Sequence, residues 1–151
     1  MVLIVPSLVT ERIESIKAGI IGAGAFIIAE LTILIAKDLD LVNHLLSEAN
    51  LANMTSLAEM WLVQLIIGAV SGFLFGVAYR YIIRDDRNSH LNDGAVLAFG
   101  LVRGLALIEK NLVIAELLSV LLLIIQSIVC FAIARLVIDL AIARKFIKPF
   151  V

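Results

Sequence analysis

Residues 117–134, LLSVLLLIIQSIVCFAIA, form a run of sequence without a single formal charge. An α-helix rises about 1.5 Å per residue, so roughly 20 apolar residues cross the hydrocarbon layer of a membrane. The apolar residues on either side extend this run from Leu112 to about Ile142. The stretch therefore predicts a membrane-crossing helix, and this prediction decides the fold class.

Three further apolar runs precede it. The first is interrupted only by Glu30, the second carries no charge between residues 60 and 79, and the third is short and carries Arg103. Ser56 and Glu59 have the spacing of a capping box ahead of the second run. We expect an all-α membrane protein, a single domain over residues 1–151, with four spans at about 18–36, 60–81, 93–109 and 112–142.

The composition agrees with lipid as the solvent. Of the 151 residues, 62% are hydrophobic and 17% are charged, and the mean hydropathy is +1.11. A soluble domain is closer to half apolar, so the excess has no water-soluble core to fill. The net charge of −1 gives no electrostatic footprint for nucleic acid. The expected surroundings are the lipid bilayer, and no nucleic-acid partner is expected.

The basic residues predict the orientation, because Lys and Arg concentrate on the cytoplasmic side of membrane proteins. With four spans, three basic segments fall on one face: Arg12 and Lys17, then residues 80–87, then residues 144–148. The other face has only two basic residues among several acids. We therefore expect both termini on the cytoplasmic or stromal side.

Two stretches outside the spans have apolar residues at helical spacing. Near the N-terminus these are Val9, Ile13, Ile16 and Ile20, with Glu11, Arg12 and Glu14 on the other side. Residues 37–56 repeat the pattern. Both stretches predict short amphipathic helices that lie at the membrane surface.

Arg103 and Glu30 are the deepest charges that the sequence places in the membrane. A lone charge near the middle of the layer costs a few kcal/mol on insertion scales, so Arg103 should face protein and have a partner. Counted along the helices, Glu30 is the only acid at a comparable depth. We predict an ion pair between Glu30 and Arg103, joining spans one and three halfway through the layer. It either fixes helix register or forms part of a substrate, proton or ligand site.

Glycines recur every four residues on two spans, at Gly68, Gly72 and Gly76 and again at Gly100 and Gly104. Small residues at this spacing let a second helix approach closely, which is the main source of packing energy in a membrane. These faces either pack within one chain or form a face for self-association or for a partner subunit.

Arg135 and Asp139 are spaced i,i+4 and predict an ion pair at the inner interface. Tyr79, Tyr81 and Trp61 suit the aromatic belts at the two membrane boundaries. The chain has two histidines, His44 and His90, and both fall in the loops between the expected spans. No catalytic motif, phosphate loop or set of metal ligands is present. We expect no enzyme, no metal site and no cofactor, with bound chlorophyll or carotenoid as an alternative.

The stretch from Gly72 to Glu109 resembles a small membrane-protein family of cyanobacteria and chloroplasts. The likeness lies in a YRY sequence with a basic loop and in an AFGLVRGL helix, carried here by Tyr79, Arg80, Tyr81, Gly100, Arg103 and Gly104. The resemblance implies residence in the thylakoid or the cyanobacterial plasma membrane. It implies no reaction.

These observations favour a non-catalytic accessory or assembly subunit that packs against larger complexes of a photosynthetic or respiratory membrane. The glycine faces suit close docking to other membrane subunits or to a second copy. Two alternatives remain, a small homo-oligomeric transporter or channel and a pigment- or lipid-binding membrane protein.

Overall fold

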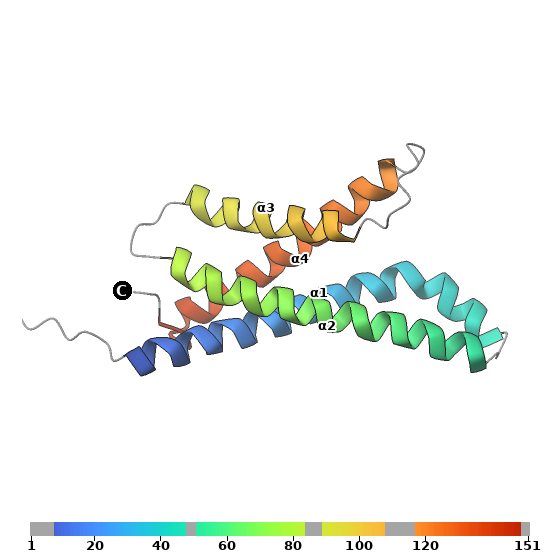
Figure 1. Cartoon of the computed structure of the whole chain (residues 1–151), viewed down its shortest axis with the longest axis horizontal. Coiled ribbons are helices and arrows are strands. Elements are labelled where there is room, and N and C mark those ends of the chain that lie inside the picture. The colour runs from blue at the N-terminus through green and yellow to red at the C-terminus, as the bar shows by residue number, and fades with distance from the viewer. Residues whose placement is uncertain (1–7, 48–50, 84–88, 108–116, 149–151) are drawn as a thin grey trace, which may run out of the picture.

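The structure is a computed structural model that describes residues 8–47, 51–83, 89–107 and 117–148. It contains four helices: α1 (Leu8–Ser47), α2 (Leu51–Ile82), α3 (Ser89–Ala106) and α4 (Leu117–Ala143). Their directions alternate along the chain (Figure 1). We call the end at which α1 and α3 begin and α2 and α4 end the basic end, and the opposite end the distal end.

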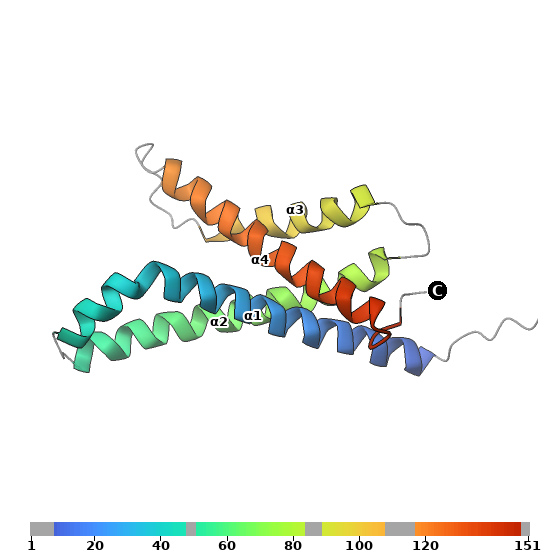
Figure 2. The same cartoon turned by 180° about the vertical axis from the view of Figure 1, so that it is seen from behind.

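The helices form two antiparallel pairs. α1 and α2 lie side by side, and α3 and α4 cross next to them, as the front and back views show (Figures 1 and 2). α4 also contacts α1 and α2, whereas no Cα atoms of α1 and α3 come within 8 Å of one another in the part of the chain that the structure describes. α1 and α3 therefore occupy opposite corners of the bundle.

Three of the helices are long and apolar enough to cross a membrane, over Leu8–Ala36, Trp61–Ile82 and Val120–Ala143. α3 is not among them, because its 18 residues include the polar sequence Ser-His-Leu-Asn-Asp at the start and Arg103 near the end. The all-helical prediction is thus confirmed. A fourth membrane crossing through α3 stays a prediction.

The two segments expected to form surface helices continue the long helices instead. Residues 8–17 form the first turns of α1 and residues 37–47 form its last turns, because no proline or pair of glycines interrupts the chain there. α2 begins at Leu51, so the capping box predicted at Ser56 and Glu59 falls inside the helix. Residues 109–111, where the third expected span meets the fourth, lie outside the described residues.

The interior of the bundle contains mainly aromatic side chains and alanines. Phe26, Phe75, Tyr79 and Phe131 are fully buried and lie in contact with one another and with Phe99, their ring centres 4.7–5.7 Å apart. Alanines from all helices but α2 complete this core: Ala25, Ala29, Ala95 and Ala134. Offset and edge-to-face ring pairs add to the packing energy of the rings.

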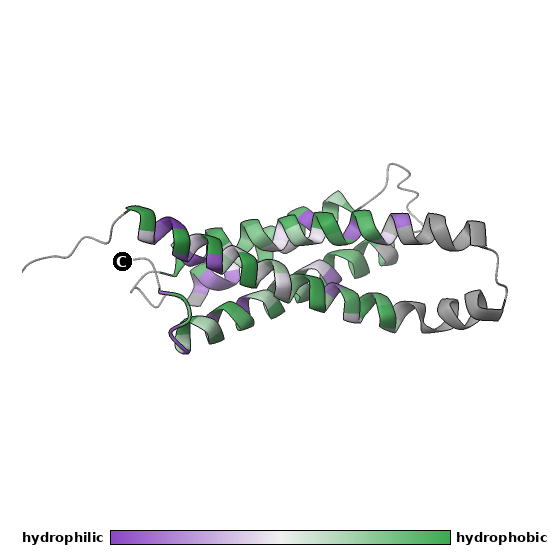
Figure 3. Cartoon of the chain, turned by 90° about the horizontal axis from the view of Figure 1, so that it is seen from below, coloured by the Kyte–Doolittle hydropathy of each residue, from purple (hydrophilic) through white to green (hydrophobic). Residues whose placement is uncertain are grey.

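The outside of the bundle is covered by large apolar side chains. Ile20, Ile28, Val63, Val102 and Leu118 are each more than half exposed, and they represent a larger group on all four helices. The buried side chains, in contrast, include Glu14, Glu30, Arg80 and Arg103. Most of the coloured ribbon is hydrophobic, with hydrophilic residues gathered toward the basic end (Figure 3). This distribution reverses that of a soluble protein and fits a lipid environment.

Candidate functional site

The Glu30 cluster consists of Glu30 on α1, Gln64 on α2 and Arg103 on α3. Arg103 Nη2 donates to Glu30 Oε1 at 2.5 Å, and Gln64 Nε2 donates to the same oxygen at 3.3 Å. The side chains of Glu30 and Arg103 are only 2% and 6% exposed. The structure therefore brings the two predicted partners into direct contact, and their ion pair links the opposite corners of the bundle.

The packing around the pair explains how side chains from α1 and α3, at opposite corners of the bundle, can meet. Gly68 of α2 faces the Glu30 carboxylate, and a Cβ atom at this position would collide with Oε2. The Arg103 guanidinium lies over the ring of Phe26, with Cζ 4.9 Å from the ring centre. A cation over an aromatic face is attracted by the ring quadrupole. Gly68 thus leaves space for the Glu30 carboxylate, and the Phe26 ring attracts the Arg103 guanidinium.

The cluster lies in the distal half of the apolar segments of α1 and α2. Gln64 comes three residues after Trp61, where the apolar segment of α2 begins, and Glu30 comes six residues before Ala36, where that of α1 ends. At 1.5 Å per residue these separations are about 4.5 and 9 Å. The position of the pair halfway through the membrane stays a prediction, because these segments are defined by length and composition alone.

The ion pair uses only part of its hydrogen-bonding capacity. Glu30 Oε2 and Arg103 Nη1 are buried and have no hydrogen-bond partner. A buried polar atom without a partner costs free energy, more so when it belongs to a charged group. One acceptor and one donor are thus enclosed in the interior of the protein without a hydrogen-bond partner.

A second group, the Arg80 cluster, joins three segments at the basic end. Arg80 is fully buried, and its Nη2 binds Glu11 Oε2 at 2.6 Å while its Nη1 donates to Ser15 Oγ at 2.8 Å. Its Nε donates to the main-chain oxygen of Lys148 at 3.0 Å, and the Lys148 amide donates to Glu14 Oε2 at 3.1 Å. Arg80 therefore fastens the start of α1 and the segment after α4 to the end of α2.

The Arg80 cluster is not anticipated by the sequence pattern, which uses Arg80 only as one of the basic residues that predict the orientation. α2 extends to Ile82, so Arg80 lies in its last turn. The acidic side of the first turns of α1 likewise faces the bundle: Glu14 and Ser15 are buried, while Ile13 and Ile16 are about half exposed. The signal that could have located Arg80 is its place at the end of an apolar run, between two tyrosines.

The Asp139 cluster ties α2, α3 and α4 together near the same end. Arg135 Nε lies 3.5 Å from Asp139 Oδ2, the i,i+4 pair predicted from the sequence. Arg135 Nη1 also binds Asp93 of α3, and the Tyr79 hydroxyl donates to Asp139 Oδ1 at 3.0 Å. Tyr79 is fully buried, so its predicted place in a boundary belt is wrong. Its ring belongs to the core and its hydroxyl to this cluster.

Tyr79→Phe is expected to lower the free energy of unfolding by about 1.5–3 kcal/mol, the range for hydrogen bonds to charged groups. The change keeps the ring that stacks on Phe75, with ring centres 5.3 Å apart, and removes only the donor to Asp139. Tyr81→Phe is the comparison variant: the hydroxyl of Tyr81, which is 45% exposed, accepts a hydrogen bond from the neutral Ser15 Oγ at 3.2 Å, so its removal should cost less, about 0.5–1.5 kcal/mol. Equal effects of the two substitutions, measured by denaturant titration in mixed micelles, would contradict a structural role for the Tyr79 hydroxyl.

All five predicted glycines face another helix of the same chain. Gly68, Gly72 and Gly76 of α2 lie against α1, where Gly72 would place a Cβ 2.7 Å from Cβ of Phe26. Gly100 and Gly104 of α3 lie against α4, next to the main chain of Ile128 and Ile124. Both glycine faces are thus covered within the chain.

The remaining predicted features lie apart from these clusters. His90 is exposed in the first turn of α3, and the side chain of His44 lies outside the described residues. Cys130, the single cysteine of the sequence, is buried. Within the described ranges, no three His, Cys, Asp or Glu side chains gather as they would around a metal ion.

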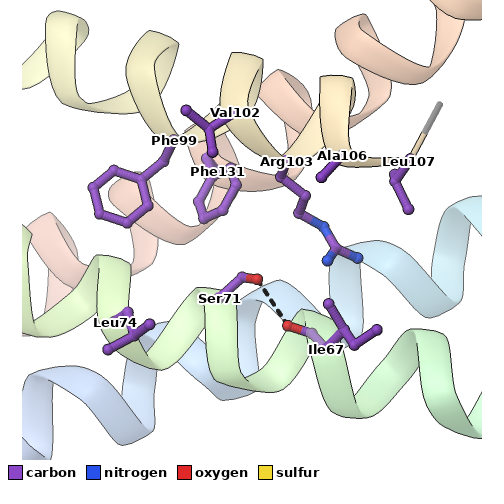
Figure 4. Close-up of a pocket in the computed structure, with 9 residues that line it drawn as sticks. All are labelled: Ile67, Ser71, Leu74, Phe99, Val102, Arg103, Ala106, Leu107 and Phe131. Atoms are coloured by element: carbon purple, nitrogen blue, oxygen red, sulfur yellow. Dashed lines mark hydrogen bonds between the residues drawn. The ribbon is translucent and has the colours of Figure 1, made fainter.

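A groove opens between α2 and α3, with a volume of about 370 Å³. Its lining, drawn in Figure 4, consists of Ile67, Ser71, Leu74, Phe99, Val102, Arg103, Ala106, Leu107 and Phe131. The Ser71 hydroxyl donates to the main-chain oxygen of Ile67 at 2.8 Å, so this polar group of the lining is already satisfied. The Arg103 side chain extends from α3 toward α2 (Figure 4).

Comparison with protein-family models, with curated proteins and with solved structures finds no match to this chain.

Proposed function

We propose that this protein is a non-catalytic integral membrane subunit that assists the assembly or stability of a larger membrane complex. In this proposal α3 crosses the membrane as a fourth span, and the basic end lies on the cytoplasmic or stromal side. The protein acts by presenting a fixed apolar surface to its neighbours.

The observation that carries the proposal is the direction in which the charged side chains point. The Glu30, Arg80 and Asp139 clusters each join helices of this one chain, so their charges are engaged in holding the helices in place. The outward faces are made of exposed leucine, isoleucine and valine side chains. A rigid bundle with an apolar exterior suits docking to lipid and to other membrane proteins.

The transporter alternative requires polar groups that follow one another through the bundle. The Glu30 cluster lies toward the distal end, and the Arg80 and Asp139 clusters lie at the basic end. Between them are the packed rings of Phe26, Phe75, Phe99 and Phe131. Along α2 the separation from Gln64 to Arg80 is 16 residues, or about 24 Å. An aromatic layer of this kind favours a sealed scaffold over a conducting pathway.

The orientation and the membrane belong to the same proposal. Lys17, Arg80 and Lys148 all lie at the basic end, where Glu14 contacts both lysine residues and Arg80 contacts the Lys148 main chain. An excess of basic residues at one end favours its cytoplasmic location. The choice of the thylakoid or the cyanobacterial plasma membrane, and of a photosynthetic or respiratory complex, rests on the resemblance of residues 72–109 alone.

Purification of the tagged protein from native membranes in a mild detergent is expected to yield a complex larger than the chain itself, with other membrane subunits in constant proportion. Size-exclusion chromatography with mass spectrometry of the peak measures this. Arg12→Met changes an exposed residue and serves as the matched control for a surface change that leaves the complex intact.

A homogeneous homo-oligomer without another subunit would contradict the proposal and favour the transporter alternative. The visible absorption of the same peak separates the pigment alternative. A colourless complex supports a pigment-free scaffold, whereas chlorophyll or carotenoid bands in constant proportion to the chain would favour a pigment-binding protein.

A further inference from the structure

The chain turns sharply where α4 ends, over residues 144–148, which we call the α4 turn. The Lys145 amide donates to the Ile142 carbonyl at 2.9 Å, and the Phe146 amide donates to the Ala141 carbonyl at the same distance. These two bonds form the Schellman motif, which ends a helix with one residue in the left-handed conformation. Lys145 is that residue, with a φ angle of 61°.

Lys145 occupies a position that usually belongs to glycine. In the left-handed conformation the Cβ atom of an L-residue approaches the backbone too closely, a strain that glycine does not have. The side chain of Lys145 is exposed, and it forms no ion pair with the residues that the structure describes. A contact within these residues therefore does not explain the lysine, and a strained residue of this kind points to a function outside the fold.

The far side of the α4 turn is fixed to the bundle beside the start of α1 (Figures 1 and 2). Ile147 is 1% exposed. The buried Arg80 donates to the Lys148 carbonyl at 3.0 Å, and the Lys148 amide donates to Glu14 Oε2 at 3.1 Å. The helix end on one side and these contacts on the other hold the residues between them in a defined place.

Those residues, Arg144, Lys145 and Phe146, form the tip of the α4 turn, and all three point outward. Arg144 and Lys145 are exposed, and Phe146 is 69% exposed. Two acids at this end, Glu11 and Glu14, are already paired with other basic residues. The tip thus combines an exposed aromatic ring with two cations that no described carboxylate neutralises.

The tip directly follows the apolar segment of α4, Val120–Ala143. Its 24 residues extend about 36 Å, enough to cross a hydrocarbon layer of roughly 30 Å. Cations without a partner are costly inside that layer, whereas basic residues next to a span meet the lipid head groups. An exposed phenylalanine suits the same boundary, because its ring can enter the region where head groups meet acyl chains.

We propose that the tip of the α4 turn binds the head group of an anionic lipid. The phosphate lies against Arg144 and Lys145, and the ring of Phe146 enters the boundary beside it. A zwitterionic lipid fits less well, because its own ammonium group repels the two cations. This inference does not depend on the accessory role proposed above.

The test measures which lipid collects beside the tip. Phe146→Trp combined with Trp61→Phe leaves one tryptophan in the chain, at the tip. This reporter protein is placed in vesicles with equal amounts of phosphatidylcholine and phosphatidylglycerol, one of which carries bromine on its acyl chains and quenches the fluorescence. Phosphatidylglycerol should bind beside the tip at least about fivefold more strongly, the factor expected for one basic residue near an anionic surface.

Two substitutions in the reporter protein separate lipid binding from folding. Lys145→Gly removes one cation and the left-handed strain, so the preference should fall about fivefold while the protein unfolds at a higher denaturant concentration. Arg12→Gln removes another exposed cation at the basic end and is the matched control. It should change the preference by less than about twofold, because salt screens charges that do not touch the lipid.

Three results would overturn the proposal. The first is equal quenching by the two lipids, or quenching by neither. The second is an equal loss of preference in Lys145→Gly and Arg12→Gln, which would assign the effect to the net charge of the basic end. The third is a Lys145→Gly variant that keeps the lipid preference but releases an acidic subunit from the native complex, in which case the tip binds a protein.

Discussion

Arg103→Met is expected to lower the free energy of unfolding by about 3–5 kcal/mol, the range for removing one partner of a buried ion pair. The substitution leaves the Glu30 carboxylate 98% buried, with Gln64 as its remaining hydrogen-bond donor. The loss of the salt bridge itself is the smaller part of this effect. The larger part is the cost of a buried charge without an opposite charge beside it.

A double-mutant cycle separates these two contributions. Replacing both partners, in Glu30→Met with Arg103→Met, removes both charges and should restore the free energy of unfolding to within about 1–2 kcal/mol of the wild type. Arg12→Met, at an exposed arginine on α1, should change it by less than about 0.5 kcal/mol. The measurement is denaturant titration in mixed micelles, followed by circular dichroism.

The cycle also decides between the two roles of the pair. If the pair fixes the helices, the single variants unfold more easily and the double variant recovers. If Arg103→Met left the stability unchanged but abolished the passage of an ion or solute into vesicles, the pair would instead belong to a transport pathway.

The helices could be predicted from the sequence because long apolar runs have few other structures available to them. The boundaries of the helices could not be predicted, because capping motifs and amphipathic patterns report only on a few neighbouring residues. The amphipathic pattern over residues 8–17 predicts a helix at the membrane surface, whereas these residues begin α1. Periodicity identifies two faces of a helix but does not say which one faces protein, and at Glu14 and Ser15 the polar face is the buried one.

The pairing of Glu30 with Arg103 could be inferred by elimination, because no other acid lies at a comparable depth. The Arg80 cluster offered no such argument. Its partners Glu11 and Lys148 are 69 and 68 residues away in sequence, so no helical spacing connects them. Asp93 could similarly have been a helix cap or an ion-pair partner, and only the position of Arg135 in the fold distinguishes these roles.

The glycine pattern could be recognised from the sequence, but the helix that covers it could not. Spacing by four residues states only that some backbone approaches. The structure places α1 there, with the Cβ position of Gly22 2.6 Å from the Gly72 carbonyl oxygen. The opposing faces of α1 and α2 thus allow a direct experimental test of contact within the chain.

Gly22→Ala is expected to destabilise the protein by about 1–3 kcal/mol, the usual cost of overpacking. The new methyl group would meet the Gly72 carbonyl oxygen and the Gly76 Cα, at 2.6 and 3.0 Å. Because both are main-chain atoms, α1 and α2 would have to move apart. Gly24→Ala is the matched control, two residues along the same helix, and its Cβ position has no atom within 4 Å.

The control should change stability in the opposite direction. Alanine is more favourable than glycine inside a helix by about 1 kcal/mol, so Gly24→Ala is expected to stabilise the protein by up to that amount. Denaturant titration of both variants, purified as single chains, provides the comparison. A different result would contradict this assignment. If Gly22→Ala stabilised the single chain as much as Gly24→Ala does, but released other subunits from the native complex, the glycine face would contact a partner and not α2.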